Sequence, residues 1–440
     1  MCVKNVIDNN IFMIYHYFIF KYYIFMMWCK MKKYVNRYIY TNFLRRHRDK
    51  PIIKVISGVR RSGKSVLLEM YRDDLISSGV SPECILSINF EMIEFENLLD
   101  YRKLHDYIIG GLVPDKKYYI FLDEIQNVPQ FEKAVDSLYV RNNVDLYITG
   151  SNAYFMSGEL ATLLSGRYVE LQILPLSFSE YVTWHKDNQI SHTVAPHTLD
   201  EYYTNYIKSS FPYTLSITND DERFDYLQGI YSTVVLKDIV NRLGVKDVGA
   251  LERILKAMMS SIGSETNVSK IRNTCESMGV KVTNQTVARW MDGIFDSLLM
   301  YSVPNYNIKG RNLLSTNQKI YSVDPGLRRL MLRDHISDRG HVLENVIFLE
   351  LLRRGNKVYR GKIGESEVDF VAISSGNEVE YLQVAWETYA ESTLKRELRS
   401  LNAVPDNYPK TLLTMDSINS EANYDGIKKS HALRWLLGND

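Results

Sequence analysis

In the first half of the chain, short runs of consecutive apolar residues alternate with longer segments in which apolar residues recur every three or four positions. The short runs predict buried strands, and the longer period predicts helices that cover them. We expect strands at 52–56, 84–90, 118–122, 145–149 and 169–174, with helices at 34–48, 64–70, 98–109, 129–139 and 160–164. This alternation is typical of an α/β domain built on a parallel sheet.

The segment between the first strand and the next helix, GVRRSGKS at 58–65, has the pattern of a phosphate-binding loop. Gly58 and Gly63 allow the backbone to turn so that its N–H groups face a phosphate. Lys64 supplies a positive charge for the phosphates, and Ser65 supplies a hydroxyl ligand for Mg²⁺. The flanking strand and helix favour this interpretation over a chance turn that carries a lysine. The residues expected to contact the nucleotide are Gly58, Arg61, Ser62, Gly63, Lys64, Ser65 and Val66.

The third strand ends in two carboxylates, Asp123 and Glu124. The carboxyl ends of parallel strands meet at one edge of a sheet, which is also the edge that carries the phosphate loop. There Asp123 would hold Mg²⁺ opposite Ser65, and Glu124 would orient and deprotonate the attacking water. Combined with the loop, this pair favours ATP hydrolysis over nucleotide binding alone.

Further polar residues lie next to later strands. Ser151 and Asn152 follow the fourth strand, where they would contact the γ-phosphate or the lytic water, or else cap the next helix. Arg167 precedes the fifth strand. It would act as an arginine finger in its own subunit or a neighbouring one, or else form a surface ion pair.

In the second half of the chain, the pattern first predicts helices and then predicts a hairpin of short strands. Helices are expected at 226–242, 248–261, 267–279 and 283–301, followed by a hairpin with strands at 301–304 and 318–323. Two short helices followed by a hairpin are typical of a winged helix-turn-helix. Its second helix would present Lys281, Gln285 and Arg289 to DNA. The surplus of basic residues is modest, so a module that contacts only another domain or a protein partner fits equally well.

The last hundred or so residues indicate a small α/β unit. A helix is expected at 340–354, followed by strands at 357–360, 367–373 and 379–384. Beyond residue 403 we expect only a short tail that ends in a helix at 426–437.

Composition adds few constraints. Of the 440 residues, 45% are hydrophobic and 24% charged, and the net charge of +1 excludes a uniformly basic or acidic surface. Four scattered cysteines without a CxxC pair exclude a disulfide framework and indicate a reducing, cytoplasmic compartment. The almost wholly apolar segment 11–29 is the exception. We interpret residues 1–30 as an extension upstream of a start at Met31, with a membrane anchor or an extra docking helix as alternatives.

Four segments together resemble a known family: GVRRSGKS, FLDEIQNV, ITGSN and SGRYVELQILPLSFSEY. They are similar to prokaryotic AAA-type ATPases that carry a C-terminal domain of unknown function, number 4143. The resemblance implies an AAA-like core, then a winged-helix segment, then a domain similar to PD-(D/E)XK nucleases. One departure is Ser209-Ser210-Phe211-Pro212, where the family usually has glycines before Phe-Pro.

In nucleases of that class, one helix acid and two strand acids hold Mg²⁺, and a lysine two residues on assists the attacking water. Glu344 and Asp369 match the first two positions. Gln383 stands in place of the second strand acid, and Ala385 in place of the lysine. Because an amide binds metal less well than a carboxylate does, we expect a non-cleaving domain in which Glu344 is structural.

The predicted fold class is therefore α/β in three parts. After the extension 1–30 come an AAA-like P-loop ATPase domain at 31–215, a helical and winged-helix segment at 216–335, and a PD-(D/E)XK-like domain with its tail at 336–440. The expected cofactors are ATP and Mg²⁺, with catalytic roles for Lys64, Glu124 and Arg167. The alternative is a nucleotide-switched module that binds DNA or a protein partner with negligible turnover. A homo-oligomer is compatible with both.

Overall fold

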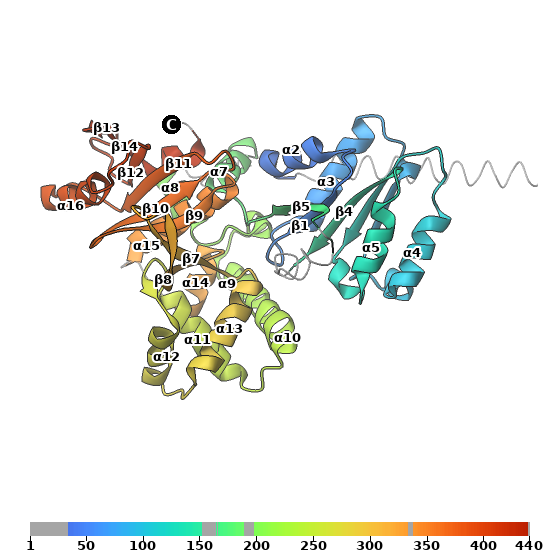
Figure 1. Ribbon diagram of the computed structural model, residues 1–440, viewed down its shortest axis with the longest axis horizontal. Coiled ribbons are helices and arrows are strands. Elements are labelled where there is room, and N and C mark those ends of the chain that lie inside the picture. Colours follow the sequence, from blue (N-terminus) through green and yellow to red (C-terminus); the bar gives the residue numbers. More distant parts are fainter. Residues whose placement is uncertain (1–33, 152–163, 165, 189–197, 333–337, 439–440) are drawn as a thin grey trace, which may run out of the picture. The chain divides into compact units, whose positions relative to one another are not determined.

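The computed structural model describes residues 34–151, 164, 166–188, 198–332 and 338–438 (Figure 1). The described residues from Arg37 onward form one compact unit, and residues 34–36 belong to another. The apolar segment 11–29 lies outside the described residues. None of the helices in the described ranges combines the length and the apolar character needed to cross a bilayer.

The first sheet has five parallel strands in the order β2-β3-β4-β1-β5. They are β1 (Ile53–Ser57), β2 (Ile85–Asn89), β3 (Tyr118–Asp123), β4 (Val144–Gly150) and β5 (Tyr168–Gln172). Strands β1 and β3 are buried along their whole length because helices cover both faces of the sheet. The predicted parallel-sheet α/β domain is thus confirmed.

Helices α2 (Tyr38–His47) and α3 (Lys64–Ser77) cover one face of this sheet, and α4 (Tyr101–Gly110) and α5 (Phe131–Tyr139) cover the other (Figure 1). Four short 3₁₀ helices complete the connections: η1 (Pro82–Cys84), η2 (Ile93–Leu98), η3 (Ile125–Asn127) and, further along, η5 (Pro212–Ser216). The carboxyl ends of the strands meet at one edge, since Ser57 is level with Gly150 and Asn89 with Asp123.

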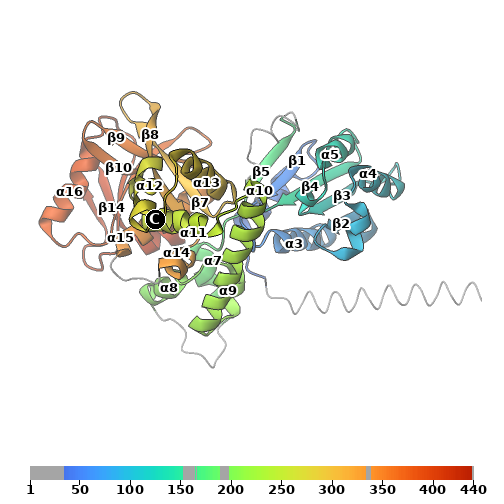
Figure 2. The ribbon, with the colours of Figure 1, turned by 90° about the horizontal axis from the view of Figure 1, so that it is seen from below.

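The described residues after β5 are largely helical as far as α14, with the first strands of the second sheet placed among these helices. The helices are α7 (Phe178–Asp187), α8 (Leu199–Tyr206), α9 (Asp220–Ser232), α10 (Asn241–Leu243), α11 (Val248–Ser260), α12 (Val268–Ser277), α13 (Asn284–Asp296) and α14 (Pro325–Leu332). Helix α9 runs through a π-helix, η6 (Thr233–Val240), directly into α10, so the three segments form one long helix (Figure 2). A π-helix of this length is rare, and such segments are frequent at functional sites.

The second sheet has nine strands in the order β13-β14-β12-β11-β10-β9-β7-β8-β6. They are β6 (Glu265–Thr266), β7 (Met300–Asn307), β8 (Asn312–Ser322), β9 (Lys357–Ile363), β10 (Ser366–Ile373), β11 (Val379–Ala385), β12 (Lys410–Thr414), β13 (Ala422–Tyr424) and β14 (Ile427–His431). Strands β9, β10 and β11 are antiparallel neighbours, whereas β11, β12 and β14 run parallel. The sheet is therefore mixed.

Helix α15 (Arg339–Arg353) packs on one face of the second sheet together with α17 (Ala432–Leu437), and α16 (Glu391–Asn402) packs on the other. The expectation of a short tail beyond residue 403 is wrong, because this segment supplies three strands to the sheet. Strand β12 is central and largely buried between β11 and β14. Its sequence, KTLLT, has only two apolar residues and therefore does not form the apolar run by which the earlier strands were predicted.

The hairpin of β7 and β8 lies where a wing was expected, but its far end is bound into the second sheet. Strand β7 pairs with β9 in parallel. At the hairpin tip the backbone N–H of Ile308 donates to the carbonyl of Lys362 at 3.0 Å, and the Ile308 side chain is buried. The tip therefore does not stand free as a DNA-contacting wing does.

Candidate functional site

The glycine-rich segment 58–65 forms the turn between β1 and the first residue of α3. A Cβ atom on Gly58 would lie 2.3 Å from the carbonyl oxygen of Ile173, so only glycine fits where the backbone passes this closely. Gly63 is the residue that precedes α3, and its φ of 101° is in the left-handed region that glycine tolerates. These two glycines shape the loop so that backbone N–H groups gather at the start of a helix, which is an anion-binding arrangement.

Ser62 lies inside this turn. Its side chain is buried, and its Oγ atom has no hydrogen-bond partner among the described residues. Its carbonyl accepts a hydrogen bond of 2.8 Å from the guanidinium of Arg37, which also forms an ion pair with Glu180. A buried hydroxyl without a partner is costly, and a phosphate oxygen would satisfy it. The loop therefore fits a phosphate.

Lys64 is buried, with 4% of its surface exposed. Its Nζ donates to the carbonyl oxygens of Gly58 at 2.9 Å and Val59 at 3.3 Å, and lies 3.6 Å from Oε1 of Glu124. Burial lowers the pKa of Lys64, and the charges of Glu124 and Asp123 oppose this shift without reversing it. The positive charge of the Lys64 ammonium is therefore only partly compensated by the acids around it.

Asp123 is the last residue of β3, at the edge that carries the loop. Its two carboxylate oxygens accept hydrogen bonds from Oγ1 of Thr149 and, at 2.9 Å, from Nδ2 of Asn89. Burial raises the pKa of Asp123, although bonds from Thr149 and Ser65 act in the opposite direction. The Ser65 hydroxyl and the Asp123 carboxylate are thus neighbours, as a shared metal site requires.

Glu124 follows directly and is also buried. Its φ of 54° lies in the left-handed region, which is uncommon for a residue other than glycine. Its N–H donates to Oγ1 of Thr149 at 2.9 Å, and its carboxylate accepts a bond from Nε2 of Gln126. Burial alone would raise the pKa of Glu124, but the charge of Lys64 and the bond from Gln126 outweigh it and lower the pKa. The carboxylate therefore stays ionised.

Two residues of this cluster were missed by sequence reasoning. Gln126 also reaches Oγ of the buried Ser151 at 3.5 Å, and its own Oε1 has no partner among the described residues. Asn89 ends β2 beside Asp123. The sequence marks both residues only weakly. Gln126 is an amide two residues after Glu124, and Asn89 lies near the end of an apolar run.

The remaining predicted site residues lie in different surroundings. Asn152 lies outside the described residues. Val66 is 41% exposed on α3. The guanidinium of Arg61 lies over the ring of Tyr226, 5.6 Å from its centre.

Arg167 lies at the amino end of β5, level with the start of β1, because Ile53 pairs with Tyr168. It forms an ion pair with Asp136 at 3.4 Å and lies over the ring of Tyr139. The phosphate loop leaves β1 at the opposite edge of the sheet, so the structure does not bring Arg167 to the loop of its own chain. An arginine finger at Arg167, in its own subunit or a neighbouring one, stays a prediction.

A second cluster of one lysine and two acids lies in the second sheet. Nζ of Lys319, from β8, contacts Oε1 of Glu344 at 2.6 Å and Oδ1 of Asp369 at 2.8 Å. The hydroxyl of Tyr321 also donates to Glu344. Burial lowers the pKa of Lys319, but the two carboxylates outweigh it and raise the pKa.

The position expected for a second strand acid is also filled. Oε1 of Gln383 accepts from the N–H of Asp369 at 3.2 Å, and Nε2 donates to Glu397 at 2.8 Å. Within the described ranges, no group of three or more His, Cys, Asp or Glu side chains is arranged to hold a metal ion. The residues here do not fit a divalent cation, because Lys319 already occupies the space between the two acids.

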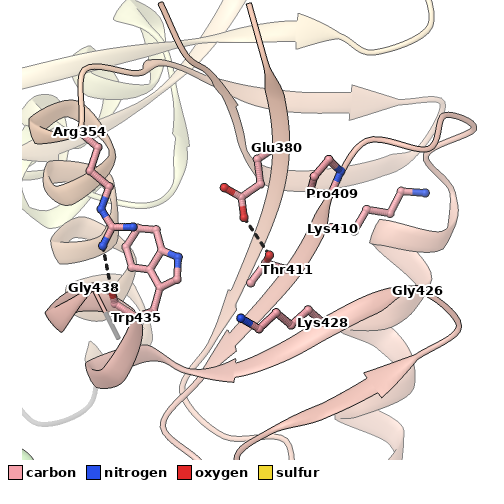
Figure 3. A pocket seen from close by; sticks show the side chains of 9 residues that line it. All are labelled: Arg354, Glu380, Pro409, Lys410, Thr411, Gly426, Lys428, Trp435 and Gly438. Atoms are coloured by element: carbon pink, nitrogen blue, oxygen red, sulfur yellow. Dashed lines mark hydrogen bonds between the residues drawn. The ribbon is translucent and has the colours of Figure 1, made fainter. Parts of the chain in front are cut away.

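A pocket of about 360 Å³ opens on the second sheet beside the C-terminal ends of α15 and α17 (Figure 3). The guanidinium of Arg354 stacks on the ring of Trp435 at 3.9 Å, and Glu380 accepts a bond from Thr411. Lys428 extends into the space between them (Figure 3). Arg354 also donates to the carbonyl oxygen of Trp435 at 2.7 Å, and Lys410 donates to the carbonyl oxygen of Val404.

The predicted DNA-contacting residues are all exposed, Lys281 in the segment before α13 and Gln285 and Arg289 on the helix itself. Arg289 donates to the carbonyl oxygen of Leu243 at the end of α10, and Gln285 lies one helical turn before it. The three residues therefore form a small exposed polar surface.

The parallel-sheet fold and the 58–65 phosphate loop are those of an AAA-type P-loop protein. Residues 50–182 match the family model described as AAA domain (AAA_14). Residues 199–336 match the model described as Domain of unknown function (DUF8612), which corrects the expectation of domain 4143. The chain belongs to the same family as an uncharacterized protein of Haemophilus influenzae. The two are 40% identical over 409 residues, covering 92% of this chain and 99% of that protein.

More distant relatives are also found. An uncharacterized protein of Methanocaldococcus jannaschii is 27% identical over 393 residues, covering 86% of this chain and 83% of its own. Among solved structures, the Walker-type ATPase of Pyrococcus abyssi is similar with a TM-score of 0.44 and 15% identity. That match covers 68% of this chain and 96% of the other.

Proposed function

We propose that the protein binds Mg²⁺-ATP at the 58–65 loop and hydrolyses it. The observation that carries this proposal is the convergence of Lys64, Asp123 and Glu124 at the start of α3, next to the buried Ser62 hydroxyl that lacks a partner among the described residues. The AAA domain match over the same residues supports it.

In this mechanism a water oxygen bonds to the γ-phosphorus as the bond to the β–γ bridging oxygen breaks, and ADP leaves with that oxygen. Glu124 accepts the proton of the water, which its lowered pKa allows because the carboxylate is ionised. Lys64 holds the β- and γ-phosphates, and Ser62 donates to a phosphate oxygen. Mg²⁺, held by Ser65 and Asp123, would neutralise charge on the phosphates.

Phosphate release by the full chain tests the proposal. Glu124→Gln should lower turnover by about 100-fold or more while ATP still binds, because the amide cannot accept the proton. Glu132→Gln changes the same residue type on α5, outside this cluster, and should leave turnover within about twofold. Background turnover by the wild type, or full turnover by Glu124→Gln, would contradict hydrolysis at this site.

A second candidate function is a nucleotide-switched module that grips DNA or a protein partner and turns over ATP negligibly. It is favoured by the exposed Lys281, just before α13, and the exposed Gln285 and Arg289 on α13, which follows α12 as the second helix of a helix-turn-helix does. Duplex DNA binding measured by anisotropy with ATP, with ADP and without nucleotide tests it. Binding that responds to nucleotide and weakens in Lys281→Ala would favour the switch, whereas absence of binding would favour a protein partner.

We further propose that the C-terminal α/β unit is similar to PD-(D/E)XK nucleases but does not cleave DNA. The support is the contact of Lys319 with Glu344 and Asp369, together with Gln383 where a metal-binding acid is needed. Incubation of plasmid DNA with Mg²⁺ or Mn²⁺ tests this. Cleavage that is lost in Asp369→Ala would overturn it.

A further inference from the structure

Arg60, the third residue of the phosphate loop, is held by acids from two distant parts of the chain. Its Nε donates to both carboxylate oxygens of Asp238, at 3.1 and 2.9 Å, and its Nη1 donates to Glu91 at 3.0 Å. Asp238 comes from the π-helix η6, and Glu91 follows β2. The guanidinium is therefore fixed in direction by groups outside the loop.

The second terminal nitrogen of this guanidinium, Nη2, is available. Among the described residues, none accepts a hydrogen bond from it, although the Arg60 side chain is only 15% exposed. A planar guanidinium whose other N–H groups are anchored can offer its remaining pair to phosphate oxygens without losing its orientation.

Arg60 also interacts with the charges of the site. Burial lowers its pKa, but Asp238 and then the charge of Glu124 outweigh this and raise it. In turn, the charge of Arg60 contributes to lowering the pKa of Lys64. The guanidinium is thus close enough to the acid and the lysine of the loop to affect both.

A hydrogen-bonded path joins this arginine to the predicted metal ligand. Asn89 donates to Asp123 through Nδ2 at 2.9 Å, and its Oδ1 accepts the N–H of Glu91 at 2.8 Å. Glu91 then pairs with Arg60. The predicted metal ligand Asp123 and the Arg60 guanidinium are therefore joined through Asn89 and Glu91 at the edge of the sheet.

From these contacts we propose that Arg60 is the catalytic arginine of this ATPase, acting on the γ-phosphate of its own chain, and that Asp238 is the residue that positions it. The proposal rests on the proposed function. As water bonds to the γ-phosphorus and the bond to ADP breaks, negative charge spreads over the γ-phosphate oxygens, and Arg60 donates hydrogen bonds to them. Because Asp238 lies in η6, the proposal also makes the rate depend on the long helix.

Turnover and ligand affinity of the full chain test this. Arg60→Ala should lower kcat by about 100-fold or more, as loss of an arginine finger does, while ADP affinity changes by less than about threefold. It should also lose the tight complex with ADP and aluminium fluoride, which mimics the transferred phosphate. Arg45→Ala is a matched control because Arg45 forms a similar two-bond pair with Asp74 on α3, and its turnover should match the wild type.

Asp238→Asn tests the positioning role separately. It should lower kcat by about tenfold with KM for ATP nearly unchanged, and it should add nothing in the Arg60→Ala background. If Arg60→Ala fails to fold, Arg60→Lys replaces it, and the expected loss of kcat is the same because lysine lacks the planar fork. A wild type without turnover would mean that the proposed function is wrong. An active wild type with an equally active Arg60→Ala, or an Asp238→Asn effect that persists without Arg60, would overturn this inference alone.

Discussion

The molecule contains two buried clusters of one lysine and two acids, and they differ in how the lysine is paired. In the first, Lys64 bonds to backbone carbonyls and its nearest acid, Glu124, is 3.6 Å away. In the second, Lys319 contacts two carboxylates at 2.6 and 2.8 Å. The two lysines are almost equally buried, at 4% and 6% exposure. Residue types alone therefore do not separate them.

The difference lies in the direction of the pKa shifts. Burial lowers the pKa of Lys64, so its charge is poorly compensated and would gain from a polyanion. Two carboxylates raise the pKa of Lys319, so its charge is already compensated. The first cluster is suited to bind a ligand, whereas the second is closed on itself and is suited to hold β8, α15 and β10 together.

The largest expected effect comes from removing the first lysine. Lys64→Ala should lower ATP turnover by about 100-fold or more and weaken ATP binding, because the phosphates lose their main point charge. Its thermal stability should be close to that of the wild type, since a poorly compensated buried charge is removed. Calorimetric ATP titration and a melting curve measure both. Unchanged ATP affinity would contradict the assignment of this cluster.

The matching change in the second cluster should affect stability instead. Lys319→Ala leaves Glu344 and Asp369 without a cation and should lower the free energy of unfolding by about 3–5 kcal/mol. Turnover per folded molecule should stay near that of the wild type. Lys395→Ala, which breaks the exposed pair with Glu391, serves as the control. Denaturant melts measure the difference, and a loss no larger than that of the control would show that the second cluster is not a structural ion pair.

Divalent cations should separate the clusters further. Without nucleotide, millimolar Mg²⁺ or Mn²⁺ should raise the melting temperature by less than about 1 °C, since Lys319 excludes a cation from the second cluster. With ATP present, Mg²⁺ should raise it clearly. A large nucleotide-independent shift that disappears in Asp369→Asn would mean that the second cluster does bind metal.

The smallest expected effect concerns Glu265, which faces Lys319 across the β6–β8 ladder. Burial would raise its pKa, but bonds from Arg360 and Asn317 outweigh it and lower the pKa to about 2. Because this pKa is depressed in the folded state, the stabilising contribution is present above the unfolded pKa, about 4.5, and is lost as pH falls toward 2. Melting temperatures of Glu265→Gln should therefore fall below the wild type at pH 7 and converge with it near pH 2–3. A constant difference across this range would contradict the assignment.

The sequence predicts those structural features that depend on residues close together in the chain, and it misses those that depend on residues far apart. A few consecutive residues are enough to predict the phosphate loop, the Asp123–Glu124 pair and each parallel strand. These features could therefore be recognised in the sequence. Lys319 could not be found in this way, because Glu344 and Asp369 lie on other elements and nothing local relates them to β8. The same holds for Arg60 and Asp238, whose pairing depends on where η6 ends. Strands β12 to β14 were missed because none of them contains more than two apolar residues, unlike the predicted strands of the first sheet.

The unbroken second sheet has a mechanical consequence. Because β6, β7 and β8 belong to the same sheet as β9 to β14, the helices α12 to α14, which connect these strands, cannot pivot against the C-terminal strands without breaking backbone hydrogen bonds. Residues from β6 to α17 should therefore move together as one rigid body. A hinge that couples ATP hydrolysis to movement of this unit has to lie before β6, where loops and helices connect it to the first sheet.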